Sequence, residues 1–291
     1  KKVFTDEPVV QKIEKDKTKE MFVTVGEDGI IFTSSDGNTW TNKRTSGTSE
    51  DIYEVTYGNS TFVTVGENGT ILTSLNGTTW TGRDSGTSKY LRGVTYRKGL
   101  FVTVGRGTIL TSTDGTYWTR RDSGTSEYLR GVTYGKGLFV TVGYSGTIIT
   151  SPDVTTWTER DSGTSKYLKG ITYGKGLFVT VGRGTILTST DGTYWTRRDS
   201  GTSEYLRGVT YGNSTFVVVG ENGTILTSLN GTTWTKRISG TSKYLYGVTY
   251  GKGLFVVVGE NGTILTSTDE YFWTERTSVT SVDLFGVTYS Q

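Results

Sequence analysis

The chain has 291 residues, and its 31 basic and 28 acidic residues leave a net charge of +3. This near balance argues against a nucleic-acid partner, and no stretch approaches the roughly 18 consecutive apolar residues that would predict membrane insertion. The sequence has no cysteine and no histidine, which excludes disulfides and thiolate metal sites and removes the commonest general base. We therefore expect neither a metal nor a cofactor.

Residues 1–20 are a charged leader to which the sequence assigns no role. The chain starts at Lys1 without a methionine or a signal-like segment, which we interpret as a sign that it is a piece of a larger protein. The cysteine-free composition, rich in threonine, glycine and asparagine, favours a bacterial protein that is extracellular or attached to the cell surface.

Residues 21–291 consist of seven repeats, each marked by one tryptophan. The tryptophans are spaced 38 to 40 residues apart, at Trp40, Trp80, Trp118, Trp157, Trp195, Trp234 and Trp273. A period near 40 that contains several short strands is typical of a β-propeller. The copies are closely alike, since Lys98–Gly135 recurs unchanged as Lys175–Gly212. A ring of near-copies offers few unique positions for an asymmetric catalytic site, so we expect that the protein is not an enzyme.

Each repeat contains four short strand candidates. In one copy these are Gly131–Tyr134, Leu138–Gly143, Thr147–Thr150 and Thr155–Arg160, separated by glycine-containing turns typical of antiparallel hairpins. Seven such repeats predict an all-β fold, a single seven-bladed propeller of four-stranded antiparallel blades. A solenoid is the alternative, but it would need atypical capping repeats at both ends.

The closure of the ring follows from where the repeats begin and end. The first repeat begins with its second strand, at Met21–Gly26, and the seventh copy of the first strand lies at the C-terminus, within Leu284–Tyr289. We expect these segments to pair, which removes the exposed edges of an open array. A competing possibility is that Val9–Glu14 supplies the first strand. The C-terminal strand is preferred because its sequence matches the other six copies.

The turn between the third and fourth strands reads Ser34-Ser35-Asp36-Gly37-Asn38-Thr39-Trp40, and similar turns recur in every repeat. It resembles the Asp-box (BNR-type) repeat of bacterial sialidase, xyloglucanase and photosystem-stability-factor-like propellers, with one residue fewer between Asp and Trp. The resemblance implies a propeller in which the aspartate is a folding element remote from any catalytic centre. This sequence departs from the motif at Asn76, Asn230, Val154 and Glu270.

Two physical interpretations of these turns compete. An Asp or Asn followed by Gly bonds its own turn backbone, while the tryptophan anchors the next strand between blades. Alternatively, each turn holds calcium, but one carboxylate per turn supplies too few of the roughly six to eight oxygen ligands that calcium needs. The turn interpretation is the stronger one.

Two series of positions differ between repeats and supply the candidate binding residues. The loops between second and third strands carry Arg106, Tyr144 and Arg183 in three adjacent repeats and acidic residues in the others. The position two residues before the first-strand valine or isoleucine is a cation in four adjacent repeats and an aromatic residue in the other three. These residues are Arg92, Arg130, Lys169 and Arg207, then Tyr246, Phe285 and Tyr53.

Both series are expected on one face of the disc, near its central channel. Cations beside aromatic rings would hold an anionic or sugar-like ligand through charge-assisted hydrogen bonds and stacking. The alternative is a solvated rim whose charges pair across blades at little gain in stability.

The sequence therefore predicts a non-catalytic binding or scaffold module, monomeric, that presents one propeller face to a protein or glycan ligand. The alternative function is a carbohydrate-binding or carbohydrate-active domain, which the Asp-box resemblance suggests. Glycoside hydrolysis needs a particular pair of carboxylates across a cleft, and the repeats single out no such pair.

Overall fold

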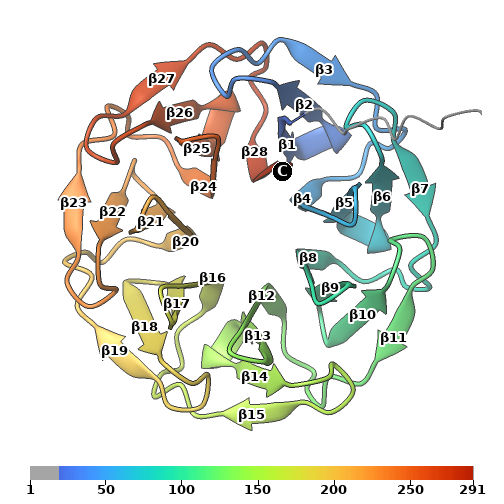
Figure 1. Cartoon of the computed structure of the whole chain (residues 1–291), viewed down its shortest axis with the longest axis vertical. Helices are drawn as coiled ribbons and strands as arrows, with labels where there is room; N and C mark the ends of the chain where they lie inside the picture. Colours follow the sequence, from blue (N-terminus) through green and yellow to red (C-terminus); the bar gives the residue numbers. More distant parts are fainter. Residues whose placement is uncertain (1–19, 291) are drawn as a thin grey trace, which may run out of the picture.

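The computed structural model describes residues 20–290, which form a seven-bladed β-propeller. Each blade is a sheet of four antiparallel strands, and the seven blades surround a central channel (Figure 1). The predicted fold class is thus confirmed. The leader, apart from Glu20, and the competing strand Val9–Glu14 lie outside the described residues.

The blades are numbered here along the chain, with the innermost strand first. Blade 1 is β28 (Leu284–Tyr289), β1 (Phe22–Gly26), β2 (Ile31–Ser34) and β3 (Asn42–Arg44). Blade 2 is β4 (Ile52–Gly58), β5 (Thr61–Gly66), β6 (Ile71–Ser74) and β7 (Thr81–Arg83). Blade 3 is β8 (Leu91–Arg97), β9 (Leu100–Gly105), β10 (Thr108–Ser112) and β11 (Thr119–Arg121). Blade 4 is β12 (Leu129–Gly135), β13 (Leu138–Gly143), β14 (Ile148–Ser151) and β15 (Thr158–Arg160).

The remaining three blades follow the same order. Blade 5 is β16 (Leu168–Gly174), β17 (Leu177–Gly182), β18 (Thr185–Ser189) and β19 (Thr196–Arg198). Blade 6 is β20 (Leu206–Gly212), β21 (Thr215–Gly220), β22 (Ile225–Ser228) and β23 (Thr235–Arg237). Blade 7 is β24 (Leu245–Gly251), β25 (Leu254–Gly259), β26 (Ile264–Ser267) and β27 (Thr274–Arg276). Single 3₁₀ turns follow four of the second strands: η1 (Glu27–Gly29), η2 (Glu67–Gly69), η3 (Tyr144–Gly146) and η4 (Glu260–Gly262).

The two ends of the described chain meet in blade 1. Strand β28 pairs antiparallel with β1, with Phe22 opposite Tyr289 and Thr24 opposite Val287. The Thr24 hydroxyl donates to the Gly286 carbonyl at 2.8 Å, and the Ser290 amide donates to the Met21 carbonyl at 2.9 Å. The predicted C-terminal closure is confirmed, and the C-terminus lies at the inner strand of blade 1 (Figure 1).

The strand bounds predicted for blade 4 differ from the structure mainly at the starts of the inner and outer strands, while β14 (Ile148–Ser151) lies one residue later than the predicted Thr147–Thr150 and β12 ends one residue later, at Gly135. The inner strand of blade 4 starts two residues before the predicted Gly131, because a β-bulge between Leu129 and Gly131 keeps the strand paired beyond its regular part. The outer strand starts at Thr158 instead of Thr155, because the residues before it belong to the Asp-box-like turn. The bulged residue of each inner strand directs its side chain into the central channel.

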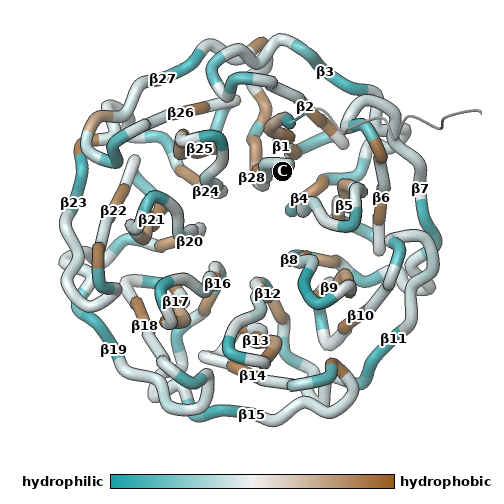
Figure 2. Tube along the Cα trace, viewed as in Figure 1, coloured by the Kyte–Doolittle hydropathy of each residue, from teal (hydrophilic) through white to brown (hydrophobic). Residues whose placement is uncertain are grey.

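The core lies between neighbouring blades. The second strand of each blade is covered on both faces, so that Phe62 and Val63, which point to opposite faces of β5, are both fully buried. Figure 2 shows hydrophobic residues along the inner and middle strands and hydrophilic residues along the outer strands β7, β11, β15 and β19. The ring is therefore held by seven equivalent apolar layers.

The Asp-box-like turns are hydrogen-bonded as the turn interpretation predicts. Asp153 Oδ1 accepts from the Thr155 and Thr156 amides at 2.9 and 3.2 Å, and the Ser151 hydroxyl donates to it at 3.1 Å. The hydrogen bonds from Thr155 and Thr156 lower the pKa of the Asp153 carboxyl to about 2. Asn76 accepts the equivalent backbone bonds in blade 2. Within residues 20–290 no group of three acidic side chains is placed to hold a metal ion.

The tryptophans pack between blades as predicted, but they are not equally buried. The Trp40 side chain is fully buried and that of Trp80 is 8% exposed, whereas the other five are half-buried. In six of the seven blades the indole N–H donates a hydrogen bond to the turn backbone; for Trp40 it donates to the Gly37 carbonyl at 2.7 Å.

No helix in the described part of the chain is long and apolar enough to span a membrane.

Candidate functional site

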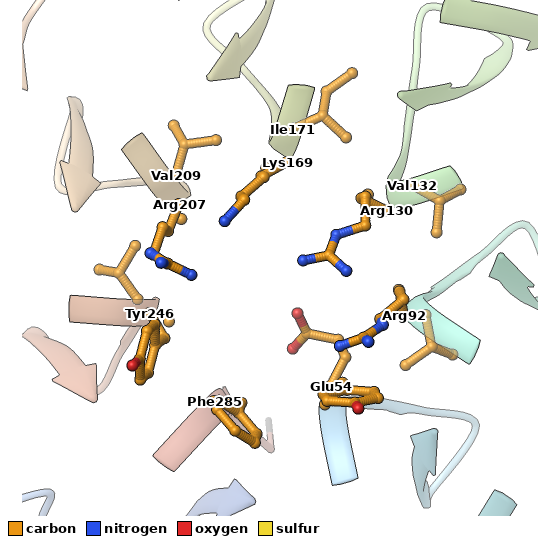
Figure 3. A pocket seen from close by; sticks show the side chains of 18 of the residues that line it. Glu54, Arg92, Arg130, Val132, Lys169, Ile171, Arg207, Val209, Tyr246 and Phe285 are labelled. Carbon is orange, nitrogen blue, oxygen red and sulfur yellow. The ribbon is translucent and has the colours of Figure 1, made fainter. Parts of the chain in front are cut away.

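A cavity of ≈ 430 Å³ occupies the mouth of the central channel, a size typical of small-ligand sites. The bulged position of every inner strand contributes one side chain to its wall. Going around the ring, these are Phe285, Tyr53, Arg92, Arg130, Lys169, Arg207 and Tyr246. Figure 3 shows the four cations pointing toward one another from adjacent blades, opposite the aromatic side chains. Seven of the ten predicted site residues therefore meet in one cavity.

The four cations, called the cationic arc below, differ in their partners. Arg207 forms an ion pair with Glu221, which lies in the loop after the second strand of its own blade. Tyr53 likewise donates to Glu67, and in both pairs the acid lies 14 residues further along the chain. The same offset from Arg92, Arg130 and Lys169 leads to Arg106, Tyr144 and Arg183. For these three cations, the loop after the second strand of the same blade therefore has no acid at the position that pairs with Arg207 or Tyr53.

The described residues contain two ion pairs, Arg207–Glu221 and Lys243–Glu275, the second at 4.0 Å. The alternative of a rim whose charges pair across blades therefore does not describe the cationic arc. Arg92 instead stacks on the Tyr53 ring, with its guanidinium carbon 3.5 Å from the ring centre. Arg130 and Lys169 lie 5.6 and 5.4 Å from the rings of Tyr144 and Tyr205. The arc is thus a partly desolvated positive surface supported by aromatic rings.

The cluster of like charges changes the acidity of its members. Burial, together with the positive charges of Arg207 and Arg130, lowers the pKa of Lys169 to about 7. Burial and the charge of Arg92 also lower the pKa of Arg130 to about 10, so that Arg130 stays charged at neutral pH. An anionic group between these side chains would relieve both effects.

The aromatic side of the cavity is packed against itself. The Phe285 ring centre lies 5.6 Å from that of Tyr53 and 5.4 Å from that of Tyr246, both in tilted arrangements. The Tyr246 hydroxyl donates to Asp283 at 2.9 Å, and burial with this bond raises the pKa of Tyr246. The ring faces are therefore largely used in contacts with each other and with Arg92.

The other three predicted residues lie on the same face but outside the cavity. Arg106 forms a backbone bridge with Tyr128 of the next blade, and its guanidinium carbon lies 4.8 Å from that ring centre. Arg183 is placed in the same way against Tyr205, at 5.0 Å. Tyr144 is stacked between Tyr128 and Tyr167, at 5.2 and 4.2 Å between ring centres. Arg106 and Arg183 are exposed, and Tyr144 is half-buried between its two neighbouring rings.

One cavity residue was missed in the sequence analysis. Glu54 follows Tyr53 along β4 and lines the cavity, with its carboxylate directed into the channel (Figure 3). The equivalent residue is glycine in the other six blades: Gly93, Gly131, Gly170, Gly208, Gly247 and Gly286. That single departure from an otherwise invariant repeat position was the available signal.

No protein-family model matches the chain, and no curated protein matches it. Several solved propeller structures are similar to it. YCF48 from Cyanidioschyzon merolae gives a TM-score of 0.63 at 15% identity, covering 80% of this chain and 88% of that chain. YCF48 bound to D1 peptide gives a TM-score of 0.63 at 17% identity, covering 90% of this chain and 85% of that chain. The computationally designed Ika8 protein gives a TM-score of 0.67 at 14% identity, covering 93% of this chain and 88% of that chain. The chain is thus a seven-bladed β-propeller similar in structure to YCF48.

Proposed function

We propose that this protein is a non-catalytic binding module whose channel mouth takes an anionic segment of a protein ligand. The observation that carries the proposal is the group formed by Arg92, Arg130 and Lys169, three adjacent cations without an ion-pair partner among residues 20–290. Holding like charges together costs free energy unless a ligand supplies the missing anion. The module acts as a monomer within a secreted or surface-attached protein.

A protein ligand is favoured over a glycan by the state of the aromatic side chains. Sugars stack on free ring faces, whereas the face of Tyr53 is covered by Arg92 at 3.5 Å and the Tyr246 hydroxyl is bonded to Asp283. Carboxylates, by contrast, fit the free guanidinium donors of the arc in charge-assisted geometry. YCF48 has been solved with a D1 peptide, so a propeller of similar fold accommodates a peptide.

The test is binding of labelled hexaglutamate, measured by fluorescence anisotropy, with hexaglutamine as the uncharged control peptide. Reversing two charges in Arg92→Glu/Arg130→Glu is expected to weaken hexaglutamate binding by roughly a hundredfold, because two charged hydrogen bonds are lost. The matched variant Arg120→Glu/Arg197→Glu changes net charge equally on the exposed outer strands β11 and β19. Equal losses in the two variants would reduce the effect to bulk charge and overturn the proposal.

Binding is expected to depend on pH through Lys169. With its pKa near 7 in the empty cavity, Lys169 is half-charged at neutral pH, and an anionic ligand favours the protonated form. Affinity should therefore be highest below pH 7 and fall as the pH rises toward 9. Glu54 titrates in the same cavity, so Lys169→Arg is the matched variant: it should flatten the part of the pH profile due to Lys169. An unchanged profile in Lys169→Arg would contradict this role.

A further inference from the structure

Glu54 is the one residue with a side chain at its position of the inner strand, because the other six blades have glycine there. A Cβ atom at Gly131 would lie 2.7 Å from the Lys169 carbonyl oxygen, and one at Gly93 would lie 2.5 Å from that of Arg130. The glycines therefore allow the inner strands to approach closely, and a side chain at this level requires neighbouring strands to separate. Glu54 is the exception that the ring accommodates, and its side chain enters the cavity (Figure 3).

Glu54 lies deeper than the cationic arc. Each inner strand starts at the mouth and runs along the channel, so successive residues lie at increasing depth. Tyr53 and its six equivalents are at the mouth, and Glu54 is one residue deeper. The next position carries an apolar side chain, and these side chains together are called the apolar collar. The collar side chains that line the cavity are Val94, Val132, Ile171, Val209, Val248 and Val287. Glu54 accepts a hydrogen bond from the Val55 amide at 3.1 Å and forms no ion pair within 4.0 Å among residues 20–290.

The surroundings of Glu54 supply no cation at its own level. On its own strand and the loop before it the ionisable neighbours are Tyr53 and Asp51; β8 contributes Arg92, which stacks on Tyr53; β28 contributes the uncharged Phe285 and Gly286. Burial raises the pKa of the Glu54 carboxyl to about 8. A carboxyl group in this setting becomes favourable as an anion only when a cationic group joins it.

We infer that the channel is a two-ended site for an amphoteric ligand, with the ammonium or guanidinium group of the ligand at Glu54 and its carboxylate at Arg92, Arg130 and Lys169. This rests on the proposed anionic site at the mouth and adds a second requirement at its floor. Because only blade 2 carries the acid, the ligand has one orientation in a ring that is otherwise nearly symmetric.

The experiment compares ligands that differ only in the ammonium group, by isothermal titration calorimetry. The probes are 4-aminobutyrate, 6-aminohexanoate and 8-aminooctanoate, each against butyrate, hexanoate or octanoate. At least one amino acid is expected to bind the wild type roughly tenfold more tightly than its matched carboxylate, the effect of one charged hydrogen bond. Glu54→Gly, which copies the other six blades, and Glu54→Gln should reduce that ratio to near one.

A second readout is proton exchange. With a pKa of about 8, the Glu54 carboxyl is mostly protonated at pH 7 before a ligand binds. A ligand ammonium group that binds there should displace this proton into the buffer. The measured binding enthalpy should then depend on the ionisation enthalpy of the buffer. Any proton uptake by Lys169 is common to both members of a ligand pair and cancels in the comparison. Equal binding of the paired ligands to the wild type would overturn the two-ended site while leaving the anionic site standing. Failure of every probe to bind while hexaglutamate binds would likewise overturn only the two-ended site, whereas failure of hexaglutamate as well would overturn both.

Discussion

A chain that lacks residues 284–291 is expected to lose more than about 5 kcal/mol of stability, a large share of what a domain of this kind possesses. The truncation removes Leu284 and Val287, which are buried against Phe22 and Trp40, and all the hydrogen bonds between β28 and β1. It also exposes the edge of β1 and leaves a gap between β4 and β24 in the innermost ring. Calorimetry should show a melting temperature lowered by more than about 10 °C or no cooperative transition.

A synthetic peptide of residues 284–290 provides the control for this truncation. Added in excess, it should restore part of the lost melting temperature, because its side chains and backbone groups fit the vacant inner position. A scrambled peptide of the same composition should not. A truncated chain that melts like the full chain would show that β28 does not close the ring.

Replacement of Trp40 by alanine is expected to cost about 3–5 kcal/mol. Its side chain is fully buried, its ring centre lies 6.4 Å from that of Phe22, and it packs with Leu254 and Val256 of blade 7. A backbone bridge to Ser278 of the same preceding blade adds to its enclosure. The loss should appear in urea unfolding as a lower midpoint with an unchanged slope.

Trp118 is the matched control, because it occupies the equivalent position in blade 3 but is only half-buried. Trp118→Ala should cost clearly less than Trp40→Ala. A third variant, Trp40→Phe, retains most of the packing and removes the hydrogen bond to Gly37, at a cost of about 1 kcal/mol. If Trp118→Ala proved as costly as Trp40→Ala, burial between blades would not be the source of the stabilisation.

The fold was predictable from the sequence because one repeat carries the whole pattern. The spacing of Trp40 through Trp273 determined the number of blades, and the offset between Met21 and Tyr289 determined how the ring closes. The residues at which strands begin and end could be predicted less well from the sequence. The bulge before Gly131 depends on pairing with β13, and the late start of β15 depends on the bonds of the Asp153 turn. Both are contacts between segments, which no local pattern expresses.

The site was predictable in part. The series from Tyr53 to Phe285 lines one cavity because equivalent positions of a ring face the same axis. Arg106 and Arg183 lie outside the cavity because each forms a backbone bridge with the next blade, a contact between repeats that the loop sequence alone does not reveal. Glu54 was not predicted because its position departs from glycine in one repeat only, whereas the predicted positions vary in several repeats. A position that varies once is easily taken for background.

The most direct test of the proposed binding site is a crystal structure of this protein with hexaglutamate. We expect carboxylates within hydrogen-bond distance of Arg92 and Arg130 at the channel mouth, with Lys169 beside them. A peptide lying along the outer strands, or on the opposite face where the Asp-box-like turns are found, would contradict it.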